Sequence, residues 1–192
     1  MALLIAGVVF WSIVHLLPSA APGIRANLSS KLGEMPYKGL FAFDILIALG
    51  LIVFGWKSAL PSSIYAPPFF GSPVPSVFII IGIIFLVASS VPNNLKRYIR
   101  HPQMTGVLFW SIGHLLANGD SRSLVLFGGL GLWSILEMTF INKRDGAWQI
   151  PRRVAMQKDV VAAIIAAAVF AGLVFFHVPL FGVAAIPAAG IG

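Results

Sequence analysis

The sequence predicts an all-α integral membrane protein, built as a bundle of six helices. Of its 192 residues, 58% are hydrophobic and only 10% are charged, and the mean hydropathy of +0.93 exceeds that of soluble domains. A helix needs roughly 20 apolar residues to cross a bilayer, and the chain holds six such runs. These runs are residues 2–18, 39–60, 74–92, 103–119, 122–141 and 160–178.

The boundaries of these runs carry residues that start or stop helices. A proline-rich outer loop, residues 67–75, separates the second run from the third. Pro102 suits the first turn of the fourth helix, and the polar turn Asn118–Asp120 ends it. The sixth run is rich in alanine over Ala162–Gly172, which allows close helix packing. The connections are short, so we expect one transmembrane domain over residues 1–192.

The charge distribution predicts the orientation of the helices. Lys and Arg accumulate in the cytoplasmic loops of membrane proteins. Eleven of the 13 lie in the connections after the first, third and fifth runs, and only Lys57 and Arg122 remain for the opposite side. The eleven are Arg25, Lys31, Lys38, Lys96, Arg97, Arg100, Lys143, Arg144, Arg152, Arg153 and Lys158. This alternation supports six spans and places both termini on the outer side.

The net charge of +7 does not indicate a nucleic-acid-binding protein. The cations lie in short loops beside apolar runs, and no folded basic domain accompanies them. Membrane lipids with anionic headgroups are therefore the expected partners. The chain has no cysteine, which excludes disulfides, thiolate metal ligands and cysteine nucleophiles.

A repeated octet is the strongest candidate for a functional motif. Phe10–Leu17 recurs 99 residues later as Phe109–Leu116, with seven of eight positions identical and a histidine, His15 or His114, at the same place. An ionisable side chain inside an apolar run is costly and usually functional. The two copies lie in the first and fourth runs, which cross in opposite directions, so the octet predicts two inverted three-helix repeats.

The histidine pair predicts a haem site. Helical rise places both side chains near the middle of the bilayer. Two imidazoles fill the two axial positions of a haem iron, whereas structural zinc needs four ligands and no carboxylate or thiol lies close in sequence. We therefore expect His15 and His114 to be metal ligands. The alternative is that each histidine hydrogen-bonds a neighbouring helix or lines a small polar cavity.

Further residues are expected around this cofactor. Trp11 and Trp110 precede the histidines by four residues, so each shares a helix face with its histidine and forms an aromatic wall. Ser12 and Ser111, three residues before the histidines, are candidates for contacts with the ring or the imidazole.

Cations at the cytoplasmic ends of the helices are candidates for binding the haem propionates. Arg100 is one of them, together with Arg25 and Lys96. His101 is either a helix cap at the interface or a contact for substrate or propionate. It lies 13 residues before His114, so it cannot be a second axial ligand from that helix.

The block from Arg100 to Asp120, behind an N-terminal run that contains His15, resembles the NnrU family of bacterial membrane proteins. That family is similar to the plant and cyanobacterial 15-cis-zeta-carotene isomerases. The resemblance covers nearly the whole chain. It implies haem b held by His15 and His114, in a bacterial inner membrane with both termini periplasmic.

The resemblance implies two alternative activities, so whether the protein is an enzyme stays open. NnrU proteins imply nitrite and nitric oxide metabolism in denitrification, with a small gas as ligand. The relatives imply redox-gated cis–trans isomerisation of an apolar polyene. A second alternative rests on Arg100, His101, Pro102 and Gly106, which are similar to a motif of isoprenylcysteine carboxyl methyltransferases. Those enzymes use S-adenosylmethionine and leave His15 without a role.

Overall fold

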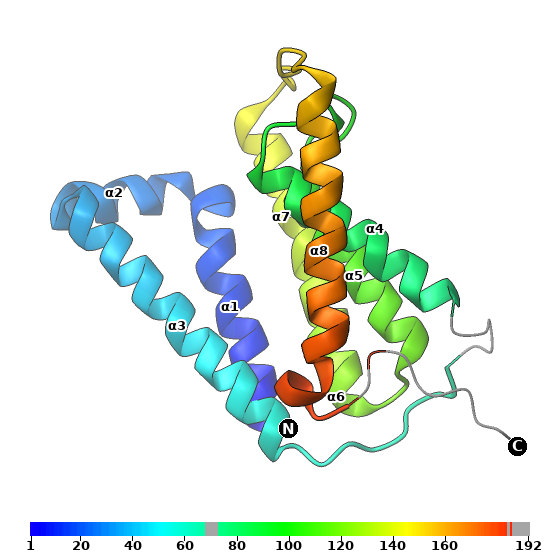
Figure 1. Ribbon diagram of the computed structural model, residues 1–192. Coiled ribbons are helices and arrows are strands. Elements are labelled where there is room, and N and C mark those ends of the chain that lie inside the picture. Colours follow the sequence, from blue (N-terminus) through cyan, green and yellow to red (C-terminus); the bar gives the residue numbers. More distant parts are fainter. Residues whose placement is uncertain (68–72, 184, 186–192) are drawn as a thin grey trace, which may run out of the picture. The chain divides into compact units, whose positions relative to one another are not determined.

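A computed structural model describes residues 1–67, 73–183 and 185, and the regular secondary structure within these ranges is helical, apart from an isolated β-bridge between Ser63 and Asp120 (Figure 1). Part of the predicted outer loop, residues 67–75, lies outside the described residues. The elements are α1 (Ala2–Ala20), α2 (Pro22–Leu32), α3 (Glu34–Ser58), α4 (Pro73–Ser90), the 3₁₀ turn η1 (Leu95–Arg97), α5 (Pro102–Ala117), α6 (Ser121–Ser123), the π-helical turn η2 (Leu124–Gly128), α7 (Gly129–Asp145) and α8 (Met156–Phe181).

Several of these helices are suited to crossing a membrane. Five helical segments of the described chain are long and apolar enough: α1, α3, α4, the continuous segment Ser121–Asp145, and α8. The predicted run 103–119 forms α5, which has only 16 residues because it begins at Pro102 and ends before Asn118. It rises about 24 Å, less than the roughly 30 Å of a hydrocarbon core. A multi-pass membrane protein is confirmed, and six spans stay a prediction.

The connection between the first two runs contains a helix that the hydropathy pattern did not predict. Pro22 occupies the first turn of α2, where its missing N–H has no cost. Gly33 separates α2 from α3 with a φ of 88°, a left-handed conformation that suits glycine. Figure 1 shows α2 joining the ends of α1 and α3.

The helices form two compact units that do not follow the two halves of the sequence. Unit 1 holds α1, α2, α3, α6, η2 and α7, and unit 2 holds α4, η1, α5 and α8. One copy of the repeated octet therefore lies in each unit, on α1 and α5. The inverted repeats expected from the sequence would instead group three consecutive helices in each half.

Backbone contacts at glycines hold α1 against α3 in unit 1. A Cβ atom on Gly7 would lie 2.7 Å from the Ile52 nitrogen, and one on Gly55 would lie 2.6 Å from the Leu4 Cα. Real Cβ atoms do not approach so closely, so only glycine permits this separation of the helices. Val8 packs beside these contacts. A Cβ atom on Gly129 of α7 would lie 2.5 Å from the Val8 Cγ1, so this glycine makes room for the valine side chain.

Unit 2 uses the same device between α4 and α5. Cβ atoms on Gly82 and Gly106 would lie 2.8 Å from the Trp110 nitrogen and the Gly82 oxygen, respectively. Gly106 follows Gly7 by 99 residues, so the repeat extends from the octet to the helix contact. Small residues at such interfaces let membrane helices pack tightly.

An asparagine connects the end of α4 to the start of α8. The Asn94 backbone N–H and side-chain amide each donate to the Asp159 carboxylate at 2.6 Å. The same side chain also exchanges hydrogen bonds with the Val154 carbonyl and N–H, both at 2.9 Å. These four bonds of Asn94 satisfy its own backbone N–H and both backbone groups of Val154, and they hold the start of α8 within unit 2.

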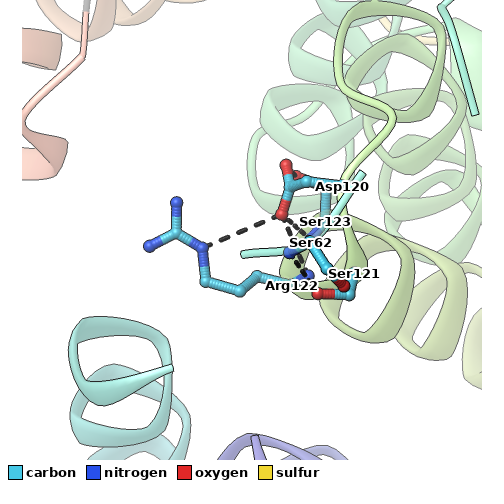
Figure 2. Close-up of polar contacts among 5 residues, drawn as sticks. All are labelled: Ser62, Asp120, Ser121, Arg122 and Ser123. Carbon is cyan, nitrogen blue, oxygen red and sulfur yellow. Dashed lines mark hydrogen bonds and ion pairs between the residues drawn. The ribbon is translucent and has the colours of Figure 1, made fainter. Parts of the chain in front are cut away.

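A polar turn in unit 1 begins the helical segment that leads into α7 (Figure 2). The Asp120 carboxylate accepts hydrogen bonds from the backbone of Arg122 and Ser123 and from the Ser123 hydroxyl, at 2.6 to 3.1 Å. Ser121 exchanges hydrogen bonds with the backbone of Ser62. The Arg122 guanidinium lies 4.7 Å above the Trp56 ring, which ties the turn to α3.

We expect Gly55→Ala to lower the free energy of unfolding in detergent by about 1–3 kcal/mol, because the added methyl group forces α1 and α3 apart. Gly50→Ala on the same helix is the matched control, since no atom lies within 4 Å of its added Cβ. Alanine is the better helix former, so the control should be neutral or stabilised. Equal unfolding curves for the two variants would contradict the glycine contact.

Asp120 should stabilise the protein in a pH-dependent way. Partial burial raises the pKa of Asp120, but the hydrogen bonds from Ser123 and Arg122 outweigh it and hold the pKa below its usual 3.8. The stabilisation is therefore present above 3.8 and is lost as the pH falls through the lowered value. We expect Asp120→Ala to cost about 1 kcal/mol at neutral pH, measured by chemical unfolding.

The difference between Asp120→Ala and the native protein should shrink in acid. Asp120→Asn is the matched control, because it keeps a side-chain oxygen that can accept the backbone hydrogen bonds but has no carboxyl to titrate, so the cap itself should not respond to pH in this variant. A cost for Asp120→Ala that is the same in acid as at neutral pH would argue against the charged cap.

Candidate functional site

His15 lies within a cluster of aromatic rings drawn from three helices of unit 1. The centroid of its ring is 4.2 Å from that of Trp11 on α1 and 5.1 Å from that of Trp133 on α7. Phe41 on α3 meets it edge-on at 5.8 Å. The expected Trp11 wall is thus present, and two further rings complete it.

A backbone hydrogen bond determines the tautomer of His15. Its Nδ1 lies 2.9 Å from the Trp11 carbonyl oxygen. A carbonyl oxygen can only accept, so Nδ1 carries the proton and Nε2 carries the lone pair. Metal-binding histidines usually donate their other ring N–H in this way, which fixes the ring and raises its basicity.

His114 repeats this arrangement in unit 2. Its Nδ1 lies 2.9 Å from the Trp110 carbonyl oxygen, and the two ring centroids are 4.8 Å apart. The bond again protonates Nδ1 and leaves the lone pair on Nε2. The neighbouring Gly113 replaces Val14 of the first copy, and a Cβ there would lie 2.9 Å from the Pro75 oxygen on α4. This glycine brings α4 close to the histidine.

The two serines of the octets differ in their hydrogen bonds. The Ser12 hydroxyl donates to the Val8 carbonyl at 2.7 Å, so its proton is not directed at His15. Ser111 is only 1% exposed, and its hydroxyl has no hydrogen-bond partner within the described chain. Ser111 is therefore the serine with a donor left for another group.

Arg100 and His101 lie at the other end of α5 from His114. The His101 carbonyl accepts the Thr105 N–H at 2.9 Å, the first bond of the helix ladder. The 13 residues between the two histidines correspond to about 20 Å along the helix axis. Unit 2 therefore does not bring Arg100 or His101 to the His114 imidazole.

Two buried polar atoms beside His15 have no hydrogen-bond partner in the part of the chain that the structure describes. They are the Nε1 atoms of Trp11 and Trp133. Buried groups of this kind are nearly always hydrogen-bonded in folded proteins. These atoms are therefore candidates for contacts with a bound polar group.

The sequence contains a signal for Trp133 that the octet comparison missed. The tripeptide Trp-Ser-Ile occurs at Trp11 and Trp110, and again at Trp133. Four residues after Trp133 the chain has Glu137 where the octets have histidine. The third copy lies on α7 and faces α1, which explains how its tryptophan reaches the His15 ring. Phe41 has no comparable signal, because phenylalanine is common in apolar helices.

The donor set favours some kinds of metal site over others. Within the described residues, no group of three or more His, Cys, Asp or Glu side chains could hold a metal ion. A protein cage of four ligands is therefore not formed by this part of the chain. Axial ligation of haem needs only two imidazoles, and the two histidines carry the matching tautomer.

Comparison with known proteins identifies the family. A family model described as NnrU protein matches residues 3–185. Searches of curated proteins and of solved structures found no match. Because the family match extends over nearly the whole chain, including both histidine helices, this membrane protein belongs to the NnrU family.

Proposed function

We propose that this NnrU-family protein binds haem b in the membrane, with the Nε2 atoms of His15 and His114 as axial ligands. The observation that carries the proposal is the identical Nδ1 bond to the carbonyl of the preceding tryptophan, at 2.9 Å in each copy. It prepares both imidazoles in the tautomer that ligation requires.

The surroundings of the histidines fit a large apolar ring with polar edges. Trp11, Trp133 and Phe41 provide aromatic surface around His15, and Trp110 does so for His114. The unpartnered hydroxyl of Ser111 and the indole N–H groups of Trp11 and Trp133 supply donors. We propose Arg100 and His101 at the membrane surface as candidates for the propionates, alongside Arg25 and Lys96.

The residues also limit how such a site could work. Haem, when bound, would supply reversible one-electron chemistry and a position for a small gaseous ligand. His15 and His114 would hold the group, so any response to a redox change or to a small ligand would act through these two imidazoles. The Nδ1 bond to the preceding tryptophan carbonyl would keep each imidazole oriented toward the group.

Family membership supports a link to nitrite and nitric oxide metabolism in a bacterial inner membrane. A haem-dependent isomerase of the carotenoid type would use the same two histidines, so the site supports both. Methyl transfer from S-adenosylmethionine is less well supported, because it gives the repeated histidine tautomer no role.

The proposal extends to the topology. Cations on one side of the predicted spans support cytoplasmic loops there and periplasmic termini. Two glycine contacts separated by 99 residues, at Gly7 and Gly106, support descent of the histidine helices from one repeated element. The 16-residue α5 can serve as a sixth span if its ends lie within protein rather than lipid.

Absorption spectroscopy of the purified protein, produced with haem precursor supplied, tests the ligands. We expect a Soret band, with sharp α and β bands after reduction by dithionite, because two imidazoles make the iron low-spin. His15→Ala and His114→Ala should each abolish the sharp bands. His177→Ala is the histidine control: His177 of α8 interacts electrostatically with His114, but its Nδ1 bonds the Val183 carbonyl, so the sharp bands should survive its removal. A colourless native protein, or bands that survive both substitutions, would overturn the haem proposal.

Thermal unfolding measures the same site without reference to activity. A ligand that binds only the folded protein stabilises it by about 2.7 kcal/mol at a concentration 100 times its Kd. Adding haem should therefore raise the unfolding temperature of the native apoprotein and of His177→Ala. It should have little effect on a variant in which both His15 and His114 are alanine. An equal shift in that variant would indicate nonspecific partition of haem into the detergent.

A further inference from the structure

A cavity open to the surface lies in unit 1, lined by residues of α2 and of the beginning of α3. Its volume is about 370 Å³, within the range of small-molecule sites. The polar residues that line it are Arg25, Ser29, Ser30, Glu34, Tyr37 and Lys38. Of these residues only Arg25 is also a candidate for a haem propionate, and the others take no part in the proposed haem site.

Tyr37 gives the first indication of a ligand. Its side chain lines the cavity, yet the residue is only 8% exposed and its hydroxyl has no hydrogen-bond partner in the described residues. Tyrosine is usually buried this deeply only when its hydroxyl is bonded. Tyr37 is therefore one of the residues around the cavity, and its buried hydroxyl is a donor for which the described chain supplies no acceptor.

The charges around the cavity indicate an anion. Lys38 Nζ donates to Glu34 Oε1 at 2.6 Å, so the one carboxylate in the lining is already matched by a cation. Arg25 forms no salt bridge within 4.0 Å to a carboxylate in the described parts of the chain. A guanidinium presents paired donors that match the oxygens of a phosphate.

The beginning of α3 adds to this preference. Gly33 is its N-cap and provides no side-chain cap for the first backbone N–H groups. These groups and the helix dipole favour negative charge at a helix N-terminus. The lining of Arg25, the Tyr37 hydroxyl and the serines therefore suits an anion with several acceptor oxygens.

The position of the cavity distinguishes a lipid from a free anion. It is lined by α2, which connects the candidate membrane spans α1 and α3, and by the start of α3, so we infer that it lies at headgroup depth. Ile24, Leu32 and Met35 are 54%, 46% and 75% exposed on the same two helices and offer surface to acyl chains. The positive-inside pattern puts this end on the cytoplasmic side, where anionic headgroups attract basic segments.

We propose that this cavity binds the phosphate group of an anionic phospholipid, with Arg25 and the Tyr37 hydroxyl as its main donors. The lipid would join α2 to α3 and anchor the first connection at the membrane surface. The proposal does not depend on haem binding, so the two can fail separately.

Titration of the full-length protein with lipid, followed by native mass spectrometry, tests the site. The probes are phosphatidylglycerol, zwitterionic phosphatidylcholine and inorganic phosphate. Arg25→Gln should weaken phosphatidylglycerol binding about tenfold, because it removes a charged donor to the phosphate. Tyr37→Phe removes one oxygen and should weaken it about threefold to tenfold.

Two substitutions serve as matched controls. Lys31→Gln removes a cation from α2 that does not line the cavity, and Tyr98→Phe removes a hydroxyl from an exposed tyrosine of unit 2. Both should bind phosphatidylglycerol as the native protein does. Far-UV circular dichroism checks that each variant is folded, and Tyr37→Phe keeps the test valid if Arg25→Gln does not fold.

The outcomes separate the possible ligands. Preference for phosphatidylglycerol that is lost in Arg25→Gln and Tyr37→Phe but kept in both controls supports the proposal. Equal losses in Arg25→Gln and Lys31→Gln would mean general attraction of lipid to positive charge and would overturn it. Inorganic phosphate that displaces the lipid at comparable concentration would overturn the lipid assignment in favour of a free anion.

Discussion

Direct contact between helix backbones at glycines is the constraint on which both units depend. In a membrane no hydrophobic force drives helices together, so tight packing has to supply the attraction. Gly7 and Gly55 bring α1 onto α3, and Gly82 and Gly106 bring α5 onto α4. Each histidine follows its glycine, Gly7 or Gly106, by eight residues, about two helical turns. The packing contact and the candidate ligand therefore belong to one repeated element.

Within that element, the helix itself prepares the histidine. A carbonyl four residues earlier lies on the same face and accepts the Nδ1 proton, so the tautomer needs no residue from another helix. Trp133 on α7 then closes the aromatic cluster around His15 in unit 1. Its own Trp-Ser-Ile motif is followed by Glu137 at the position of the histidine. The same tripeptide therefore precedes a carboxylate on α7 and an imidazole on α1 and α5.

Much of the fold could be predicted from hydropathy, because a membrane leaves a strong pattern of apolar runs. The helical class and most span positions agree with the structure. One feature did not follow from that pattern, because the helix α2 is polar and short and therefore resembles a loop by composition. The two ends of α5, by contrast, agree with the prediction that Pro102 begins this helix and that the turn at Asn118 ends it.

The sequence by itself determined the membrane class, the repeated histidines and their tryptophans, because these depend on residue type and on spacing along one helix. Only the tertiary structure decided that Phe41 and Trp133 surround His15, and that the buried Tyr37 lines a cavity together with Arg25. Such contacts join helices distant in sequence, and many apolar faces are chemically alike. Which faces meet depends on where the backbones can approach, and glycine contacts between particular helices decide that.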